Sequence, residues 1–461
     1  MRKIDFIIAL FFVGNLAMAQ TSVWHGGREM WTRGEGTEEN PYLIENADQL
    51  AMLSYAVNKG YNMSDLHFKL TTDIDLNGSE DQPWFPIGLA YYSEDGCERK
   101  KEYYTGISFM GNFDGGGHAI SNIYVDSKTR AGLFGYVHSA DTVVLKNIRI
   151  VNGYIKGELA GGIVGYAGKV VISECYNAAE IYGNQAGGIS GRYGFIERCY
   201  NIGKVSATGA VGGITPMLGG FIRQCYNSGE VISEGNIAGG IAGISMDVHC
   251  HSIENCYNTG AVTVLSPDTI NTSGCGGIVG FLVANRISLH NCYNVGSVVG
   301  NEGLTGGIVG SEVEQDSVLN CYYLNTCGAQ GLGIAMDEDA MRTPDFVATL
   351  NDNTDVWNMD EDNHNNGFPI LMNLDMAVDE VSEKDFVVYP NPTQGILRIE
   401  GGHIEEVEVF NVLGVKVMQR SMRSCDGTAT LDVSTLADGF YLLRVVDSQK
   451  AYRSCPFVVR H

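Results

Sequence analysis

A Gly-Gly-Ile motif that recurs at the length of one structural unit constrains the fold of this chain most strongly. The six copies are separated by steps of 26, 25, 27, 37 and 30 residues. They begin at Gly161, Gly187, Gly212, Gly239, Gly276 and Gly306. Counted from the second glycine, each copy is followed 11 to 16 residues later by Cys-Tyr-Asn or a degenerate form of it. Such self-similarity indicates a repeat architecture, in which one repeat is one unit of structure.

The content of each unit favours strands. Short β-prone runs alternate with Gly and Asn turns, and no helical period is present. We therefore predict an all-β chain whose main part is a right-handed parallel β-helix, with coils stacked about 4.8 Å apart. A β-propeller is the less favoured alternative, because each blade needs about four strands and 40 or more residues.

The repeats also resemble a known family. Copies of Gly-Gly-Ile-x-Gly followed by x-Gly-x-Val, within residues 105–330, resemble the GLUG repeats of bacterial surface proteins. This resemblance implies a solenoid that is displayed outside the cell.

Three further segments are assigned around the repeats. We expect residues 20–104 to form the N-terminal cap of the β-helix, residues 331–373 to form its C-terminal cap, and residues 374–385 to be a linker. Residues 367–371 are expected to cover the last coil.

Two helices are predicted in these caps. Asn46 can cap a helix that has Gln49 at its third position, and Leu50, Leu53 and Val57 lie on one face of that helix. In the second cap, Thr343 followed by Pro344 is typical of a helix start, with Phe346 and Leu350 on its apolar face.

The last 75 or so residues carry three motifs in a fixed order. These are Tyr-Pro-Asn-Pro at 389–392, a hydrophobic-Asn-x-x-Gly step that ends at Gly414, and Leu-x-x-Gly-x-Tyr at 436–441. Short segments of period two, broken by Gly395, Gly414 and Gly439, predict a small antiparallel β-sandwich over residues 386–461.

The same motifs resemble the C-terminal sorting domain of type IX secretion cargo. The residues that carry the resemblance are Tyr389, Pro390, Asn391, Pro392, Gly395, Gly414, Gly439 and Tyr441. The resemblance implies contact with the type IX machinery, export through a Gram-negative outer membrane, and removal of the domain with anchoring at the surface.

The N-terminus agrees with export. Arg2 and Lys3 precede a short apolar run, and the small-x-small pattern that ends at Ala19 predicts a signal peptide over residues 1–19, cleaved before Gln20. We expect no transmembrane segment, because no other stretch approaches 18 apolar residues. The net charge of −24 argues against nucleic acid as a partner.

Alignment of the repeats predicts the environment of their cysteines. Ile123 and Ile148 fall in the same column as the repeated cysteines, so this column is an apolar interior position where Cys behaves as a small hydrophobe. Stacked neighbours would still be close enough for occasional disulfides. Cys425 and Cys455 are the better candidates for a disulfide pair.

If these cysteines point inward, the tyrosines that follow them point outward, since side chains alternate along a strand. The tyrosines are Tyr176, Tyr200, Tyr226, Tyr257 and Tyr293. We expect an exposed row that could contact a ligand. The alternative is a self-stacking ladder that only stabilises the coils.

No catalytic, cofactor-binding or metal-binding residue is assigned. The trio Asp73, Asp75 and Asp114 is the best set of carboxylates, but a turn role is favoured. His249-Cys250-His251, expected on a loop, and residues 362–367, which resemble half a calcium loop, are weak metal candidates.

These observations favour an exported, surface-displayed β-helix of adhesin or ligand-binding type, with a surface glycan or host protein as partner. The alternative is a β-helix carbohydrate-active enzyme, either a polysaccharide lyase or a glycoside hydrolase. We expect no cofactor and weigh enzymatic activity as the lesser hypothesis.

Overall fold

The computed structural model forms two compact units, residues 1–374 and 375–461. In the first unit it describes residues 21–90, 106–245, 251–265, 273–282, 287–301, 303–311, 317–352 and 354–372. In the second unit it describes residues 387–390, 393–400, 404–411, 416–422, 428–437, 439–447 and 452–460.

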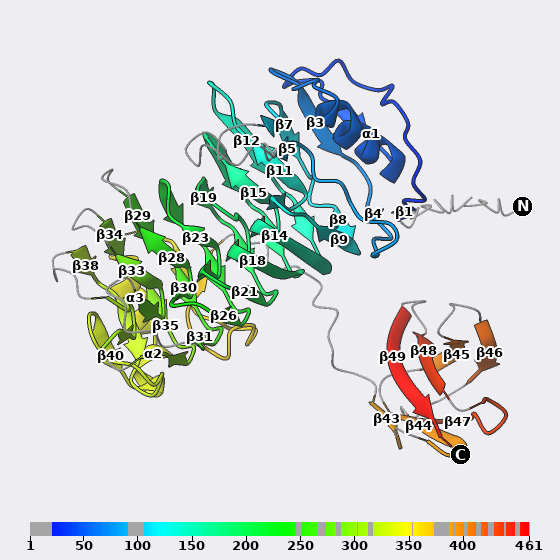
Figure 1. The fold of residues 1–461 in the computed structure, drawn as a ribbon. Coiled ribbons are helices and arrows are strands. Elements are labelled where there is room, and N and C mark those ends of the chain that lie inside the picture. The colour runs from blue at the N-terminus through cyan, green and yellow to red at the C-terminus, as the bar shows by residue number, and fades with distance from the viewer. Residues whose placement is uncertain are drawn as a thin grey trace, which may run out of the picture. The chain divides into compact units, whose positions relative to one another are not determined.

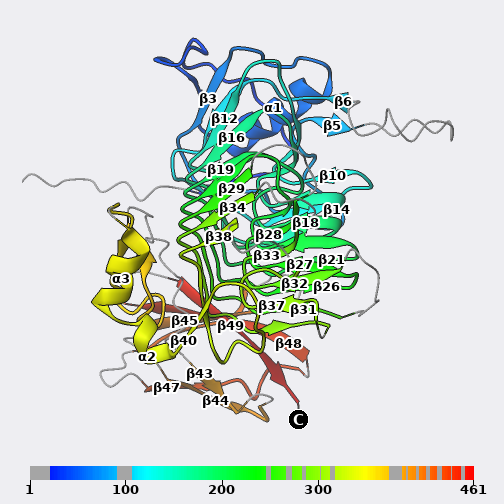
Figure 2. The same cartoon turned by 90° about the vertical axis from the view of Figure 1, so that its left-hand side faces the viewer.

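The first unit is a parallel β-helix, as predicted (Figure 1). Its strands form three long sheets along the axis, in which each strand pairs with its counterpart in the next coil (Figure 2).

Sheet 1 contains β1 (Ser22–Val23), β4 (Ile74–Asp75), β8 (Ala119–Ser121), β13 (Arg149–Ile150), β17 (Tyr176–Asn177), β20 (Tyr200–Asn201), β25 (Tyr226–Asn227), β30 (Tyr257–Asn258), β35 (Tyr293–Asn294), β39 (Tyr322–Leu324) and β40 (Ile334–Met336). Sheet 2 contains β2 (Tyr42–Ile44), β3 (His67–Leu70), β7 (Asn112–Asp114), β12 (Val143–Lys146), β16 (Val170–Ser173), β19 (Phe195–Glu197), β24 (Phe221–Arg223), β29 (His251–Glu254), β34 (Ile287–His290) and β38 (Val318–Leu319).

Sheet 3 contains β9 (Ile123–Asp126), β10 (Arg130–Ala131), β14 (Gly153–Gly161), β18 (Glu180–Gly187), β21 (Val205–Ala207), β22 (Ala210–Gly212), β26 (Val231–Ser233), β27 (Ile237–Gly239), β31 (Val262–Val264), β32 (Gly274–Gly276), β36 (Val298–Val299) and β37 (Thr305–Gly306). Two smaller parallel sheets follow the Gly-Gly-Ile corners: β11 (Phe134–Val137) with β15 (Val164–Ala167), and β23 (Thr215–Met217) with β28 (Ala242–Ser245) and β33 (Val279–Leu282).

Coils stack with like residues in register. Tyr176 pairs with Tyr200 and Asn177 with Asn201, and the same pairing continues through the next coils. The inward-pointing side chains of successive coils therefore form continuous columns, which a single repeat cannot bury by itself.

The repeated cysteines lie in this interior, and the register confirms their alignment with Ile148. The alignment with Ile123 is wrong, because Ile123 is buried in β9 of sheet 3, where it pairs with Gly153. All six cysteines are free thiols, exposed by no more than 1 %. They are Cys175, Cys199, Cys225, Cys256, Cys292 and Cys321. Burial raises the pKa of the Cys199 and Cys256 thiols, so these groups are neutral in the core. Cys425 and the side chain of Cys455, the expected disulfide pair, lie outside the described residues.

A left-handed residue precedes each member of this column and turns the chain from sheet 2 to sheet 1. Its φ lies between 48° and 55° in every coil. Four of the seven positions are asparagine, which tolerates this conformation well: Asn147, Asn255, Asn291 and Asn320. In the other three coils Glu174, Arg198 and Gln224 adopt it.

The asparagine of Cys-Tyr-Asn forms a second buried column. In the first four of the five members, the amide Nδ2 donates to the Oδ1 of the next coil, for example from Asn201 to Asn227 at 2.8 Å and from Asn227 to Asn258 at 2.8 Å. Each also donates to a backbone carbonyl two residues ahead, as Asn227 does to Gly229. Every described member is fully buried, so the ladder satisfies polar groups that water cannot reach.

The Gly-Gly-Ile and Cys-Tyr-Asn motifs pack against each other in the folded coils. A Cβ atom on Gly188 would lie 2.3 Å from Cγ of Asn201 and 2.3 Å from the carbonyl oxygen of Gly213. The equivalent glycine of the next coil, Gly213, is just as close to Asn227. The second glycine therefore makes room for the amide ladder, which explains why the two motifs recur together.

The helix predicted near the N-terminus is confirmed as α1 (Ala47–Asn58). The Asn46 side chain accepts a hydrogen bond from the Gln49 backbone amide at 2.9 Å, and Gln49 Oε1 accepts from Glu45 N at 2.7 Å. Leu50, Leu53 and Val57 are fully buried. The parallel sheets extend back into this region, since β2 and β3 precede residue 105. The antiparallel pair β5 (Leu89–Ala90) and β6 (Gly106–Ile107) adjoins them.

The second predicted helix is α3 (Pro344–Asn351), which follows α2 (Glu338–Met341). Thr343 Oγ1 accepts from the Phe346 backbone amide at 3.2 Å. Next comes the antiparallel pair β41 (Trp357–Asn358) and β42 (Ile370–Leu371). Residues 367–371 do not simply close the last coil as expected, because Pro369 accepts a hydrogen bond from Tyr293 on the side of sheet 1.

The second unit contains two antiparallel sheets. One joins β43 (Val387–Tyr389), β44 (Ile396–Glu400) and β47 (Thr428–Asp432); the other joins β45 (Ile404–Asn411), β46 (Lys416–Ser421), β48 (Gly439–Asp447) and β49 (Tyr452–Val459). Alternate residues such as Leu397, Val407 and Leu443 are buried in a common core. This is the small sandwich that the sequence predicts.

The amide ladder yields a testable expectation. Asn227→Ala removes the partners of both Asn201 Nδ2 and Asn258 Oδ1, and buried groups without partners are costly, so the free energy of unfolding should fall by about 2–3 kcal/mol. The exposed Asn184 bonds only Thr208 Oγ1, and Asn184→Ala should change it by less than about 0.5 kcal/mol. Urea unfolding of the two variants provides the comparison, and equal midpoints would contradict a stabilising ladder.

Candidate functional site

The five tyrosines of Cys-Tyr-Asn form a continuous stack along sheet 1. Neighbouring ring centroids are 4.8 to 5.1 Å apart. From Tyr200 to Tyr293 the neighbouring rings are nearly parallel, with interplanar angles of 11°, 7° and 4°. The expected exposure of this row is wrong, because the five side chains are only 0 to 7 % exposed. Burial raises the pKa of Tyr257 and Tyr293 well above the ordinary value, so both phenols are neutral.

Residues 337–372, here called the covering segment, pack against the row at Tyr257 and Tyr293. The Trp357 ring lies 5.8 Å from Tyr257 and 5.5 Å from Tyr293, and its Nε1 donates to Asn255 Oδ1 at 3.2 Å. The Phe346 ring meets Tyr322 edge-on at 5.0 Å. Figure 2 shows α2 and α3 outside the coils. Tyr257 and Tyr293 thus belong to a stacked ladder and lie beneath a docked segment.

The loop that resembles half a calcium site serves this docking. The Asp360 carboxylate accepts hydrogen bonds from the backbone amides of His364, Asn365 and Gly367 at 2.7 to 2.8 Å. Asn365 Nδ2 in turn donates to the hydroxyl of Tyr293 at 2.7 Å. The loop therefore holds the covering segment on the ladder.

The three candidate carboxylates each hold a turn or a neighbouring coil. Asp73 Oδ1 accepts from Ala119 N and lies 3.1 Å from His118 Nδ1. Asp75 Oδ1 accepts from Asn77 N at 2.7 Å and from Asn122 Nδ2 at 2.9 Å.

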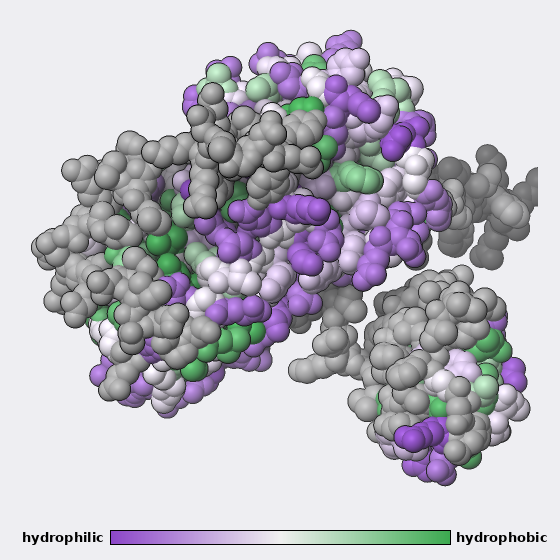
Figure 3. All heavy atoms as spheres, viewed as in Figure 1, coloured by the Kyte–Doolittle hydropathy of each residue, from purple (hydrophilic) through white to green (hydrophobic). Residues whose placement is uncertain are grey.

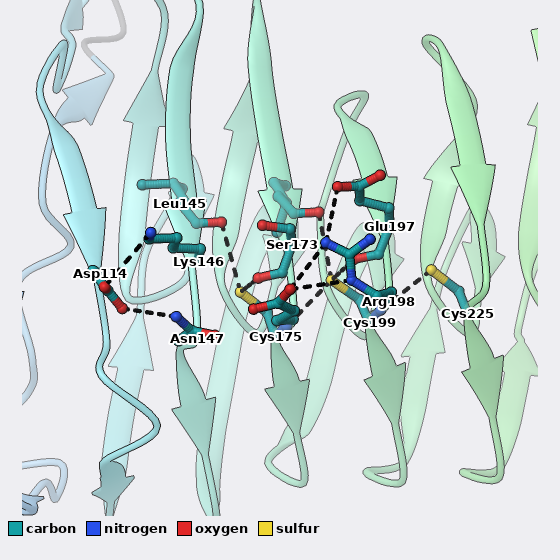
Figure 4. A network of polar contacts seen from close by, with 12 residues as sticks. Asp114, Leu145, Lys146, Asn147, Ser173, Cys175, Glu197, Arg198, Cys199 and Cys225 are labelled. Atoms are coloured by element: carbon teal, nitrogen blue, oxygen red, sulfur yellow. Dashed lines mark hydrogen bonds and ion pairs between the residues drawn. The ribbon is translucent and has the colours of Figure 1, made fainter. Parts of the chain in front are cut away.

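The third carboxylate, Asp114, accepts from Gly116 N and from Asn147 Nδ2, both at 2.9 Å, and lies 3.7 Å from Lys146 Nζ. Figure 4 shows Asp114 beside Asn147 and Lys146 of the next coil. These contacts agree with the turn role that the sequence analysis favoured.

The histidine cluster falls only partly within the described residues. His249 and Cys250 lie outside them. His251 does not lie on a solvated loop as expected: it begins β29 and is 6 % exposed, with Nδ1 3.2 Å from the Gly220 carbonyl oxygen. Among the described residues, no group of three or more His, Cys, Asp or Glu side chains is arranged to hold a metal ion.

A second aromatic cluster, with its rings packed edge to face, lies at the corner near sheet 3. Tyr136 and Tyr166 pair in register, and their ring centroids are 5.5 Å apart. The Arg130 guanidinium lies 4.0 Å from the Tyr136 ring centroid and 4.8 Å from that of Tyr166. Burial lowers the pKa of Arg130. This cluster is also part of the packed scaffold.

Sequence reasoning missed a cavity of about 260 Å³ beside α1. One wall is a face of α1 together with Lys59, which follows the helix. The others are formed by Trp24 with Arg28 and by Trp84, Phe85 and Leu89. In the view of Figure 3, hydrophilic residues cover most of the visible described surface of the β-helix, with apolar residues in small groups. The cavity beside α1 differs from that surface because aromatic side chains line it.

The sequence contained one signal for this cavity. Three of the four tryptophans, Trp24, Trp31 and Trp84, lie within the first 84 residues. The sequence does not show that Trp24 and Trp84 meet, with ring centroids 5.8 Å apart, because a whole helix and three strands separate them.

The structure describes some of the residues that form the C-terminal motifs. Tyr389 ends β43, Pro390 follows it and is exposed, and Gly395 precedes β44 with φ of 157°. Gly439 begins β48, and the Tyr441 hydroxyl donates to the Ala437 carbonyl oxygen at 2.9 Å. Asn391, Pro392 and Gly414 lie outside the described residues, as do Ala19 and Gln20 at the expected cleavage site.

Comparison with known families identifies the second unit. Residues 387–458 match the family described as the secretion system C-terminal sorting domain. The chain is thus an exported β-helix protein that carries a type IX sorting domain and is delivered across the outer membrane to the cell surface or beyond. Within the described residues, no helix combines the length and apolar character needed to span a bilayer.

Similarity to other proteins covers parts of the chain. A candidate Gly-rich membrane protein of Evansella cellulosilytica is 32 % identical over 149 residues, which is 31 % of this chain and 15 % of that protein. Halomucin of Haloquadratum walsbyi is 29 % identical over 167 residues, 34 % of this chain and 2 % of halomucin. The chain thus spans only a small part of either relative.

Among solved structures, a candidate immunoglobulin A1 protease from Bacteroides ovatus is similar to this chain, with a TM-score of 0.47 and 23 % identity. The match covers 74 % of this chain and 94 % of that protein.

The covering segment can be tested through its buried tryptophan. Trp357 is 1 % exposed, so Trp357→Ala should lower the free energy of unfolding by about 3–5 kcal/mol through the cavity it leaves over Tyr257 and Tyr293. Tyr61 is 70 % exposed, and Tyr61→Ala should cost less than about 0.5 kcal/mol. Chemical denaturation followed by circular dichroism measures both, and a Trp357→Ala variant as stable as the parent would contradict docking.

Proposed function

We propose that this protein is a ligand-binding β-helix of adhesin type, anchored at the cell surface after the sorting domain has been removed. The proposal rests mainly on the cavity beside α1, where Tyr55 and Phe85 remain 39 % and 58 % exposed. Exposed aromatic rings around a concave site are typical of binding sites. The amide and tyrosine ladders supply a rigid scaffold for such a site.

The proposed partners are the type IX machinery during export and a surface glycan or host protein afterwards. Support for the first partner comes from the sorting-domain match at residues 387–458. Support for the second comes from the location outside the cell together with the aromatic cavity.

A β-helix polysaccharide lyase or glycoside hydrolase is the competing function. Such chemistry needs carboxylates that are free to act on a substrate. Asp73, Asp75 and Asp114 instead accept hydrogen bonds from backbone amides and neighbouring coils. This engagement favours the binding function.

One experiment separates the two functions. The purified full-length protein is applied to an array of glycans and host proteins, and the captured polysaccharides are then incubated with it and analysed for new chain ends. Capture with intact polysaccharide supports the binding function. Depolymerisation, or the absence of any captured ligand, would overturn it.

The export route is tested by deletion of residues 386–461. Because the sorting domain is the part that the secretion machinery reads, the shortened chain should accumulate in the periplasm, with at least about a tenfold loss of surface protein by immunoblotting of cell fractions. Full-length protein with Tyr61→Ala serves as the control and should reach the surface. Resistance of the periplasmic product to trypsin would show that it is folded, and normal surface display of the shortened chain would contradict the proposal.

A further inference from the structure

The cavity beside α1 combines aromatic rings with polar side chains. Trp24 and Trp84 are buried, and both indole nitrogens already donate, to Gly27 O at 3.0 Å and to Leu133 O at 3.1 Å. Their rings meet at 78°, so the two indoles are nearly perpendicular. What they contribute to the cavity is therefore aromatic surface, while Tyr55 and Phe85 add two further rings.

Two side chains of α1 bring oxygen atoms into the same lining. Asn58 Oδ1 accepts from Gly88 N at 3.0 Å, and its second lone pair is suited to a ligand hydroxyl. Ser54 Oγ, which donates to Phe85 O at 2.6 Å, lies in the same wall. The site therefore suits a compact ring that has both apolar faces and hydroxyl groups.

Two cations stand beside these rings. The Arg28 guanidinium lies 4.4 Å from the Tyr55 ring centroid, and Lys59 Nζ lies 5.5 Å from it. Both residues are exposed, and neither is paired with a carboxylate among the described residues. By contrast, basic residues in the coils form ion pairs with carboxylates: Lys204 lies 3.3 Å from Glu230, and Arg198 lies 2.9 Å from Glu174.

Basic residues without an acidic partner are unexpected here, because the chain has 54 acidic residues against 30 basic ones. Two cations that share one aromatic side chain, with no described acidic partner, create a local positive site on an acidic protein. Such a site attracts an anion and stabilises it by charge-assisted hydrogen bonds.

We propose that this cavity binds one acidic sugar residue, a pyranose ring that carries a carboxylate, as part of a surface glycan. The inference rests on the proposed ligand-binding function and names the class of ligand. The C–H faces of the ring pack on the aromatic side chains, whose π faces are negative, and the carboxylate contacts Arg28 and Lys59. A volume of about 260 Å³ lies just below the range of about 300–1,000 Å³ that drug-sized ligands occupy, which suits a single ring.

Hexuronates and sialic acids share this chemistry, so the test includes both. Isothermal titration calorimetry with the full-length protein would compare a galacturonate oligosaccharide with its methyl ester, and 3′-sialyllactose with lactose. The first pair differs in the charge of the carboxylate, and the second pair differs in the presence of the acidic sugar. An aspartate-rich peptide tests whether negative charge alone is sufficient. We expect at least about tenfold tighter binding of one acidic glycan than of its neutral counterpart, and weaker binding as salt is raised.

Three variants assign this binding to the cavity. Arg28→Gln combined with Lys59→Gln should weaken acidic-glycan binding by about tenfold or more and leave the melting temperature unchanged, because both side chains are exposed. Phe85→Ala, at a ring that is 58 % exposed, should weaken binding without changing its salt dependence. Lys204→Gln removes the same charge from the coils and should have no effect on binding.

The inference is overturned by equal affinity for acidic and neutral glycans, by preference for the peptide, or by acidic-glycan binding that survives the Arg28 and Lys59 substitutions. If the array captures another ligand whose binding survives all the cavity variants, the inference fails and the proposed function stands. If the array captures nothing, the proposed function itself fails.

Discussion

The hydrogen bond between buried asparagine amides of successive coils is the interaction on which this β-helix depends. A side-chain amide at 0 % exposure needs a partner, and the partner that each coil supplies is the same amide of the next coil, at 2.7 to 2.8 Å. This geometry holds the coils in register. Once the asparagines are aligned, the cysteine two residues earlier stacks inward and the intervening tyrosine stacks outward. A three-residue motif thus determines three columns at once.

The sequence predicted this coil architecture because the determinants of a coil are local and repeated. The period indicated the solenoid, and the alignment of Ile148 with the cysteines indicated an apolar column, which the free, buried thiols confirm. The parallel alignment of Ile123 failed, because the first coils differ from the regular repeat and place Ile123 in sheet 3. Asn46 and Thr343 were recognisable as helix caps for the same reason: a cap and its partner are three residues apart.

The features that sequence reasoning missed depend on contacts between distant segments. Alternation along a strand correctly separates Tyr257 from Cys256, but it does not reveal that Trp357, a hundred residues later, packs on that tyrosine. The cavity beside α1 was missed for a similar reason. Its walls come from residues near 24, 55 and 85, and only the fold brings them together.

In-register stacking of identical residues also makes the coils interchangeable. A chain that skipped one whole coil while folding would still align asparagine with asparagine and cysteine with cysteine, so the interior columns alone cannot distinguish correct neighbours from incorrect ones. The surface differs from coil to coil: Arg198 meets Glu174 and Glu197, Lys204 meets Glu230, and Arg223 meets Glu254. Figure 4 shows Arg198 with Glu197. Exposed ion pairs of this kind add little stability, but they differ at each junction and penalise a misplaced coil. The solvent-facing charges thereby encode the order of the coils, while the interior encodes only their spacing.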